Sequence, residues 1–357
     1  VYFTDYQYQK QIKNYLTLTS GYTFKYSDGQ DMEIYGRHKN INHSLYSQAD
    51  IKYKKLNISL GSRLEHYNNG SNTYTKPIFR SGINYQVAKA TYIRASYGEG
   101  IRFPTMIERF VTFNTGPVFI YPNEDLQPET GWSAEIGIKQ GFQLGDWKGF
   151  VDLDGFAMEY NDMMEFSFGK WSNEGVGIIP GFGFKSINIG NTRIEGMEVS
   201  LGGEGKIGQT EITIMGGYTF TSPFIEDIHN EYNEFTTING GTTDTIPVSY
   251  YTTSVDTSGV LKYRYEHLAK LDIHIQHNRF NGGFSIRYNS AMKNIDKIFN
   301  EPLFEFYLGT ETSWNHLNED NLILDFRIGY ACQFFHYFYI LRISMISFIT
   351  ITKNILV

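Results

Sequence analysis

The chain has 357 residues, 41% of them hydrophobic, and a formal net charge of −7. This acidic balance argues against a general nucleic-acid binder, because phosphate binding needs clustered Lys and Arg. The single cysteine, Cys332, excludes an intrachain disulfide framework and a multi-cysteine metal site. The 27 Tyr, 27 Phe and 35 Gly residues favour strands and turns over helices.

Apolar and polar residues alternate with period two in many short segments. The opening residues, VYFTDYQYQ, read as the interior of a strand, and Leu16, Leu18, Tyr22 and Phe24 then share one face. The same pattern recurs at residues 45–53, 56–65, 79–86, 93–97, 132–139, 151–154, 197–201, 212–218, 271–276, 284–289 and 322–330. A soluble sheet with one solvent-exposed face would show the same local alternation, so the alternation alone predicts only amphipathic strands.

The lengths of the connections separate a soluble sheet from a membrane barrel. Short turns are predicted near Lys54, Val87, Gly145, Gly205 and Asn281. Long connections alternate with them, at residues 28–44, 98–127, 163–185, 223–250 and 291–321. Bacterial outer-membrane barrels sort their loops in this way. The sequence therefore predicts an all-β, transmembrane antiparallel β-barrel with long extracellular loops and short periplasmic turns.

The predicted barrel is incomplete. We count about fourteen strands, against about 22 in a plugged transporter barrel. Residues 1–357 are therefore expected to form one partial barrel domain, without an N-terminal plug and without several early strands. The C-terminal segment FFHYFYILRISMISFITITKNILV is apolar on both faces. A transmembrane helix fits its length, but Arg342 and the many β-branched residues favour a penultimate barrel strand, altered or truncated at its end.

Three ordered motifs carry a family resemblance. They are YGEGIRFPTMIERF, NEDLQPETGWSAEIGIK and NIGNTRIEGMEVSLGGEG. This series resembles the barrel signature of TonB-dependent outer-membrane receptors. The residues that match the family pattern in the first two motifs are Arg102, Phe103, Pro104, Asn123, Leu126, Pro128 and Glu129.

The resemblance implies an outer-membrane receptor and transporter. Such a receptor binds an iron chelate, a cobalamin or a glycan outside the cell and imports it with energy from TonB. Its expected partners are outer-membrane lipid, the extracellular small-molecule or glycan substrate, and TonB, which would act through the missing N-terminal plug. No cofactor is expected. The alternative hypothesis is a passive porin-like channel, which would conduct freely without a plug.

No catalytic or metal site is expected. The chain has no nucleophile elbow, P-loop or HExxH motif. An outer-membrane protease or lipase would need an acid, a histidine and a nucleophile clustered at one rim, and the sequence suggests no such cluster. His38 and His43 fall in one predicted loop, where solvated side chains are the ordinary outcome.

The long connection at residues 98–127 holds the candidate ligand-binding residues. Cationic and aromatic side chains suit an anionic or ring-bearing ligand, and loops on rigid scaffolds often carry recognition. The alternative is that this loop only packs over the lumen. The candidate residues are Arg102, Phe103, Arg109, Phe110 and Tyr121.

The alternation also predicts the two faces of the wall. Residues expected to face lipid are Leu16, Ile58, Ile83, Ile136, Val199, Ile273, Ile286 and Phe326. Residues expected to face the lumen, as a charge network or as a hydrated wall, are Arg63, Glu65, Arg80, Arg94, Glu135, Asp152 and Arg287.

Overall fold

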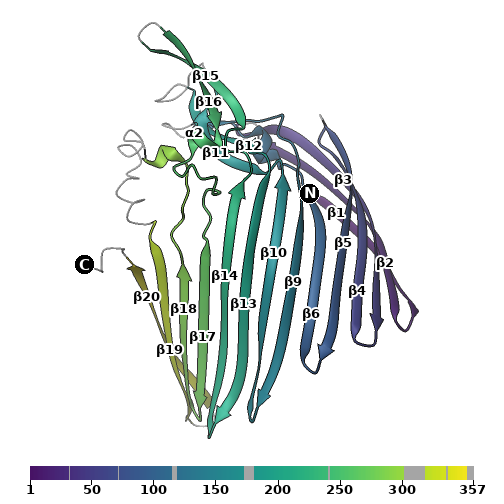
Figure 1. The fold of residues 1–357 in the computed structure, drawn as a ribbon, viewed down its shortest axis with the longest axis vertical. Helices are drawn as coiled ribbons and strands as arrows, with labels where there is room; N and C mark the ends of the chain where they lie inside the picture. Colours follow the sequence, from purple (N-terminus) through teal and green to yellow (C-terminus); the bar gives the residue numbers. More distant parts are fainter. Residues whose placement is uncertain are drawn as a thin grey trace.

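The computed structural model describes residues 1–31, 33–70, 72–114, 119–172, 181–239, 242–300, 318–334 and 337–351. Its main element is a 14-stranded sheet in which every strand pairs antiparallel with its neighbours (Figure 1). The strands, in their order across the sheet, are β1 (Tyr2–Lys13), β2 (Leu16–Asp31), β3 (Gly36–Tyr53), β4 (Leu56–Asn68), β5 (Thr73–Ala88), β6 (Thr91–Arg102), β9 (Glu129–Leu144), β10 (Trp147–Asn161), β13 (Thr192–Ile207), β14 (Thr210–Ile225), β17 (His267–His277), β18 (Phe280–Asn289), β19 (Asp320–Phe334) and β20 (Tyr337–Ile351).

The sheet is an open, curved wall rather than a closed barrel. Within the described residues β1 pairs only with β2, and β20 pairs only with β19. Figure 1 shows the tight turns along the lower edge and the long connections gathered above the other edge. The predicted partial antiparallel barrel and its number of strands are confirmed.

Five of the tight turns each place one residue in the left-handed region. These residues are Lys54, Ala90, Gly145, Gly208 and Asn278, with φ between 51° and 63°. Two-residue hairpin turns that follow the strand twist require such positive φ values. The predicted turns at Lys54 and Gly145 are confirmed, whereas those near Val87, Gly205 and Asn281 lie a few residues from the observed turns.

The glycine-rich stretch that suggested a turn near Gly205 is instead part of strand β13. A Cβ on Gly205 would lie 2.5 Å from the Trp147 ring, and a Cβ on Gly202 would lie 2.7 Å from the Phe150 ring. These glycines make room for aromatic side chains of β10, and the chain turns only at Gly208. Glycine in a strand often marks such a close approach.

The predicted long connection at residues 28–44 is wrong in its extent. Strands β2 and β3 continue to Asp31 and Gly36, and their pairing extends to that end. This extension stands beyond the apolar part of the wall, so its backbone groups pair without the apolar alternation that the prediction used. His38 and His43 therefore lie on opposite faces of a strand, not in a loop.

The other long connections carry small elements of their own. A four-stranded sheet in the order β11-β12-β8-β7 and a two-stranded β15-β16 hairpin stand above the wall, so the polar segment predicted as a loop at residues 223–250 is largely a hairpin. The bounds are α1 (Met106–Phe110), β7 (Phe113–Asn114), β8 (Phe119–Tyr121), β11 (Met164–Lys170), β12 (Phe182–Asn188), β15 (Glu231–Asn239), β16 (Thr242–Ser249), α2 (Tyr250–Thr253) and η1 (Lys297–Asn300).

The C-terminal apolar segment forms a strand. Residues of β20 pair in register with β19 from Asp320 and Ile351 to Phe334 and Tyr337. No helix in the described part of the chain combines the length and the apolar character that crossing a membrane requires.

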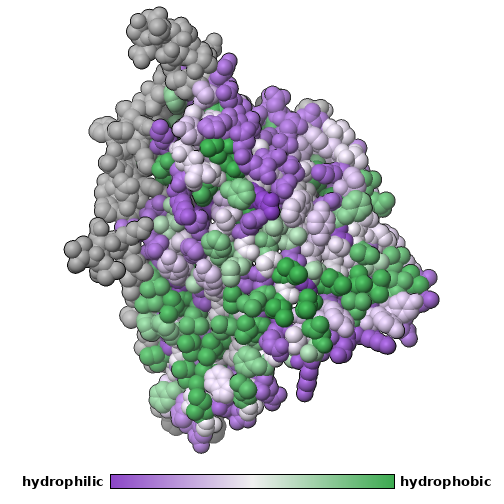
Figure 2. All heavy atoms as spheres, in the orientation of Figure 1, coloured by the Kyte–Doolittle hydropathy of each residue, from purple (hydrophilic) through white to green (hydrophobic). Residues whose placement is uncertain are grey.

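The register defines two faces of the wall. Ile58 pairs with Ile83, Ile83 with Ala95, and Ala95 with Ile136, so these side chains share one face. Continued across all strands, the register places all eight residues predicted to face lipid on this side, which we call the outer face. Figure 2 shows hydrophobic residues in a band across the lower half of the wall, with hydrophilic residues at both ends. An apolar band between polar ends is what a bilayer requires.

The opposite, luminal face carries charge networks. Arg94 lies 3.2 Å from Glu135, 2.7 Å from Asp152 and 2.5 Å from Asp154. Arg63 pairs with Glu65 and donates to Thr23 at 3.0 Å and to Ser44 at 2.8 Å. The predicted network is therefore present for these residues, whereas Arg80 and Arg287 form no ion pair with any described residue.

Candidate ligand-binding site

The segment that follows β6 folds into a short helix because its sequence supplies both halves of a capping box. Thr105 caps helix α1 by accepting a hydrogen bond from the Glu108 backbone N–H at 3.2 Å, and Glu108 accepts from the Thr105 N–H at 2.8 Å. Arg102 donates to the same Glu108 at 2.7 Å and lies 3.4 Å from Glu129 of β9. Burial raises the pKa of Glu108, but the bonds from Arg102 and Thr105 outweigh it, so this carboxyl stays ionised and fastens α1 to the wall.

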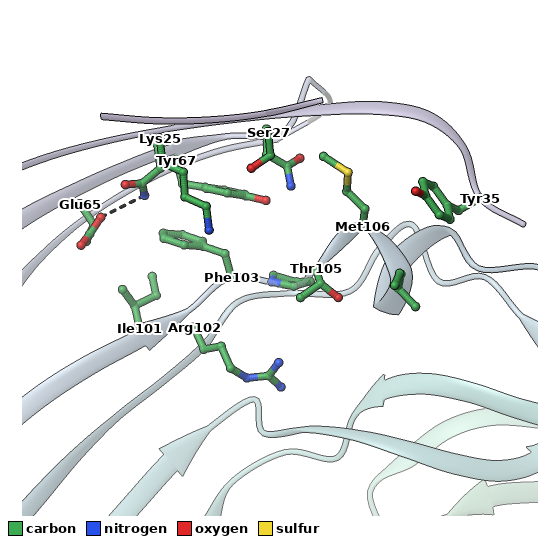
Figure 3. A pocket seen from close by; sticks show the side chains of 14 residues that line it. Lys25, Ser27, Tyr35, Glu65, Tyr67, Ile101, Arg102, Phe103, Thr105 and Met106 are labelled. Atoms are coloured by element: carbon green, nitrogen blue, oxygen red, sulfur yellow. Dashed lines mark hydrogen bonds between the residues drawn. The ribbon is translucent and has the colours of Figure 1, made fainter. Parts of the chain in front are cut away.

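A cavity of about 590 Å³ lies between this segment and the luminal face of the first strands (Figure 3). Lys25, Asn42 and Tyr67 are direct register partners across β2, β3 and β4, and they form its wall. Residues 101–107 close the opposite side. A luminal hollow under the long connections is where a barrel can hold a small ligand.

A stacked aromatic pair lines the cavity. The rings of Phe103 and Tyr67 stack with centroids 4.1 Å apart and planes 9° apart. Tyr74 tilts against Phe103 at 6.2 Å. Figure 3 shows Phe103 beside Tyr67, with Met106 and Tyr35 toward the other end of the cavity. Tyr67 is buried beneath this stack, so the partly exposed Phe103 ring and the nearby Met106 thioether supply the apolar contact for a ring-bearing ligand.

Some charged side chains around the cavity are already paired and others are not. Glu65 is nearly buried and is occupied by Arg63, by Ser44 at 2.6 Å and by Asn42 at 3.0 Å. Lys25 is exposed and forms no ion pair with any described residue. The cavity therefore presents the free Lys25 ammonium group to an incoming ligand, whereas the Arg102 guanidinium is already engaged by Glu108 and Glu129. An anionic group is favoured beside Lys25.

Two of the five predicted residues, Arg102 and Phe103, line this cavity. Arg109 and Phe110 lie behind it. The ring of Phe110 stacks on His38 at 3.5 Å with planes 4° apart. Arg109 is only 2% exposed and donates through Nη2 to the Glu124 carbonyl. These contacts pack the loop against the wall.

The fifth predicted residue, Tyr121, lies elsewhere. It belongs to β8 and pairs with Lys185 of β12, and its ring meets Phe119 edge-on at 4.5 Å. Burial raises the pKa of the Tyr121 hydroxyl, so it stays a neutral hydrogen-bond group. The structure therefore brings together only part of the predicted set, and ligand binding by any of the five stays a prediction.

Sequence reasoning missed the wall of the cavity. Lys25 and Tyr67 stand on strands far from residues 98–127 in the chain. Both residues fall at luminal positions near the extracellular ends of β2 and β4. To predict that they lie close together requires the pairing register of the strands, which alternation alone does not give.

Two further hollows continue along the luminal face. One of about 320 Å³ includes Arg63, Arg80 and Gly100, and one of about 540 Å³ includes Arg80, Arg102 and Glu129. Gly98, Gly100 and Gly131 line the second of these without side chains. Arg80 lies at the junction of both, and Glu99 and Glu129 also line the larger of the two hollows.

A buried charge cluster fastens three of the long connections together. Lys262 is fully buried, with Nζ 2.6 Å from Asp296 and 3.6 Å from Glu165 of β11, and it donates to Thr253 of α2 at 3.1 Å. Tyr263 donates to Asp296 at 2.6 Å. Burial raises the pKa of Glu165 to about 7, partly offset by Lys262. The cluster holds the elements above the lumen in fixed relation to one another.

Comparison with known proteins decides the family. The family described as "TonB dependent receptor-like, beta-barrel" matches residues 2–335. The chain belongs to this family. TonB-dependent receptors are outer-membrane transporters and receptors of bacteria, not enzymes, which confirms the predicted class and location.

Individual relatives of this TonB-dependent receptor are distant. Hemoglobin and hemoglobin-haptoglobin-binding protein A of Haemophilus influenzae is 28% identical over 110 residues, which are 30% of this chain and 10% of that protein. The hemophore receptor HasR of Serratia marcescens, solved with its hemophore HasA and heme, has a TM-score of 0.56 at 11% identity, over 92% of this chain and 54% of that one. The siderophore receptor PirA of Acinetobacter baumannii has a TM-score of 0.55 at 14% identity, over 92% of this chain and 47% of that one.

The structural matches establish the fold and its extent. The chain spans about half the length of these solved receptors. Their identity to this chain is too low to transfer a ligand.

Proposed function

We propose that this chain forms part of the barrel of a receptor that captures an iron-bearing ligand, heme or a ferric chelate, outside the cell. The ligand would enter the luminal cavity of about 590 Å³ under residues 101–107. Import would then draw energy from TonB through a plug domain.

One observation carries the proposal. The stacked Phe103 and Tyr67 rings and the free Lys25 ammonium group line the same cavity. A planar ring system with carboxylates, or a catecholate or hydroxamate chelate with net negative charge, would use both features, because the rings supply stacking area and the ammonium group neutralises charge.

A curated relative supports an iron-bearing ligand, because the Haemophilus influenzae protein that is 28% identical over 110 residues is named for binding hemoglobin. A cobalamin or a glycan, which the family resemblance also allowed, gains no such support. The passive porin-like channel gains none either, since the matched proteins are receptors.

Ligand affinity of the full-length receptor tests the proposal. Lys25→Ala should weaken binding of heme or of a ferric chelate about tenfold, because the loss of one charge-assisted contact is worth about 1.5 kcal/mol. Lys89→Ala is the matched control, since Lys89 is an exposed lysine at the tight turn between β5 and β6. Equal affinity of the Lys25→Ala variant and the wild type for both ligand classes would move the binding site away from this cavity.

A further inference from the structure

A buried lysine and a buried aspartate contact each other among the elements above the wall. Lys262 stands on the connection between β14 and β17, and Asp296 stands on the connection between β18 and β19, just before η1. The Lys262 Nζ atom lies 2.6 Å from Asp296 Oδ1, and the two side chains are 0% and 1% exposed. Their chain neighbours Leu261 and Ile295 are buried as well, so the pair lies in an apolar surrounding.

Such deep burial disfavours a pair of ions. Two charges that leave water lose hydration that their mutual attraction only partly replaces. Transfer of one proton from the ammonium group to the carboxylate removes both charges and leaves a neutral amine beside a neutral carboxylic acid. Reacting atoms in a near-attack arrangement lie about 3–3.5 Å apart, and an amine hydrogen-bonded to one carboxyl oxygen is about that far from the carboxyl carbon. The pair is therefore close enough to condense to an amide.

A third connection supplies another carboxyl group to the same place. Glu165 of β11 has its Oε1 atom 3.6 Å from Lys262 Nζ, and this oxygen is buried and accepts no hydrogen bond from any described group. Burial raises the pKa of Glu165 to about 7, and Lys262 opposes part of that rise. A carboxyl group with a pKa near neutrality can take a proton from an amine and release it again, which is what a general acid–base group must do.

The aspartate is held in a way that suits an electrophile. Tyr263 donates to Asp296 Oδ2 at 2.6 Å, and the Asp296 N–H donates to the same hydroxyl oxygen at 3.2 Å. Tyr263 has a φ of 58°, which is uncommon for a residue other than glycine. Burial raises the pKa of the Tyr263 hydroxyl, so it keeps its hydrogen. A hydroxyl fixed in this position stabilises negative charge that develops on Oδ2.

We propose that Lys262 and Asp296 join in an amide bond that the folded chain forms by itself. The neutral amine attacks Cγ of Asp296, and the new C–N bond moves an electron pair onto Oδ2, beside the Tyr263 hydroxyl. Glu165 takes a proton from the nitrogen and delivers it to the Oδ1 hydroxyl group, which leaves as water while the C=O bond to Oδ2 forms again. Each amide bond releases one water molecule, and the step needs no oxidant, reductant or other reactant.

The amide bond joins two of the long connections covalently. One of them carries the β15–β16 hairpin and α2, and the other carries η1. Because Glu165 belongs to a third connection, the bond forms only after all three connections have come together. The elements above the lumen then stay attached to each other even when their packing loosens.

Peptide mass spectrometry of the purified full-length receptor tests the proposal. A protease digest of the denatured receptor should contain a branched peptide that joins Lys262 to Asp296 and is lighter than its two parts by one water molecule. Lys262→Arg, which keeps the positive charge, should give only the separate peptides. The ion pair of Lys293 and Glu266 is an internal control, because it also has a distance of 2.6 Å and joins the same two connections, but Lys293 is 56% exposed. It should give no branched peptide.

Two further variants separate the chemistry from packing. In receptor refolded from inclusion bodies, Glu165→Gln, which cannot carry the proton, should slow formation of the branched peptide about a hundredfold. Asp296→Asn should form the same amide with loss of ammonia instead of water, which a simple ion pair would not do. Circular dichroism would confirm equal strand content for all variants. A folded wild type that yields only the separate peptides would overturn the proposal, and so would a branched peptide that forms as fast in Glu165→Gln as in the wild type.

Discussion

Phe103 stacks face to face on Tyr67, with ring centroids 4.1 Å apart, and so joins the segment after β6 to the luminal side of β4. This contact shapes the candidate cavity, because it sets the distance between the loop and the wall. Phe103→Ala should lower the free energy of local unfolding of residues 102–110 by about 1 kcal/mol, because such an aromatic pair usually contributes about that much beyond its buried area. Phe103→Leu keeps apolar volume and should cost less.

Limited proteolysis of the full-length receptor would measure this effect. The Phe103→Ala variant should be cleaved faster than wild type within residues 102–128, with Phe103→Leu between them. Equal cleavage of all three proteins would show that the stack does not hold the loop.

Tyr46 crosses the luminal face over Gly21 and donates to Gln7 of β1 at 3.2 Å. A Cβ on Gly21 would lie 2.3 Å from the Tyr46 ring and 2.7 Å from the Tyr6 carbonyl oxygen. Gly21→Ala should therefore destabilise the barrel by about 1–3 kcal/mol, as overpacking does. Gly82→Ala is the matched control, because a Cβ there meets nothing within 4 Å. Urea unfolding in lipid vesicles would compare the two, and a Gly21→Ala variant as stable as the control would refute the contact.

Ile136 is 64% exposed on the outer face, in the middle of the apolar band. Ile136→Arg should destabilise insertion by about 2–4 kcal/mol, the cost of a cation near the bilayer midplane. Ser96→Arg introduces the same side chain at the same level on the luminal face, next to Glu135, and should cost much less. Folding into vesicles of defined thickness would measure both variants. Similar penalties would mean that the two faces have been assigned wrongly.

Glu165 makes the stability of the elements above the lumen depend on pH. Lys262, Asp296, Arg264, Tyr250 and Tyr263 surround it, and burial raises its pKa to about 7. The folded state holds a proton between about pH 4.5 and 7 that the unfolded state releases, so this contribution to stability is full at low pH and is lost as pH rises through 7. The change should amount to about 2 kcal/mol, given about 1.4 kcal/mol per pKa unit and partial relaxation.

Hydrogen exchange of β11 and β12 amides at pH 5.5 and pH 8 would measure this dependence, after correction for intrinsic rates. The opening free energy should fall at the higher pH in the wild type, and Glu165→Gln, which cannot ionise, should remove the difference. A wild type with no pH dependence would place Glu165 in a more hydrated site.

The sequence predicts the wall well and the loops poorly. Alternation marks Ile58, Ile83 and Ile136 because each lies between polar or glycine neighbours, and a membrane enforces that pattern over many strands. Above the membrane no such constraint applies. Arg109 looks like a surface cation in the sequence but is 2% exposed, since its burial depends on contacts with Glu124 and Phe110 that no local pattern encodes.

Uptake of radioactive iron by cells that produce the full-length receptor tests the central claim most directly. The iron would be supplied as heme and, separately, as a ferric siderophore, in otherwise identical strains with and without TonB. We predict that one of these ligands enters only when TonB is present, and that Lys25→Ala lowers this uptake at ligand concentrations near the Kd while Lys89→Ala does not. Uptake that proceeds equally without TonB would contradict energy-coupled import and favour a passive channel.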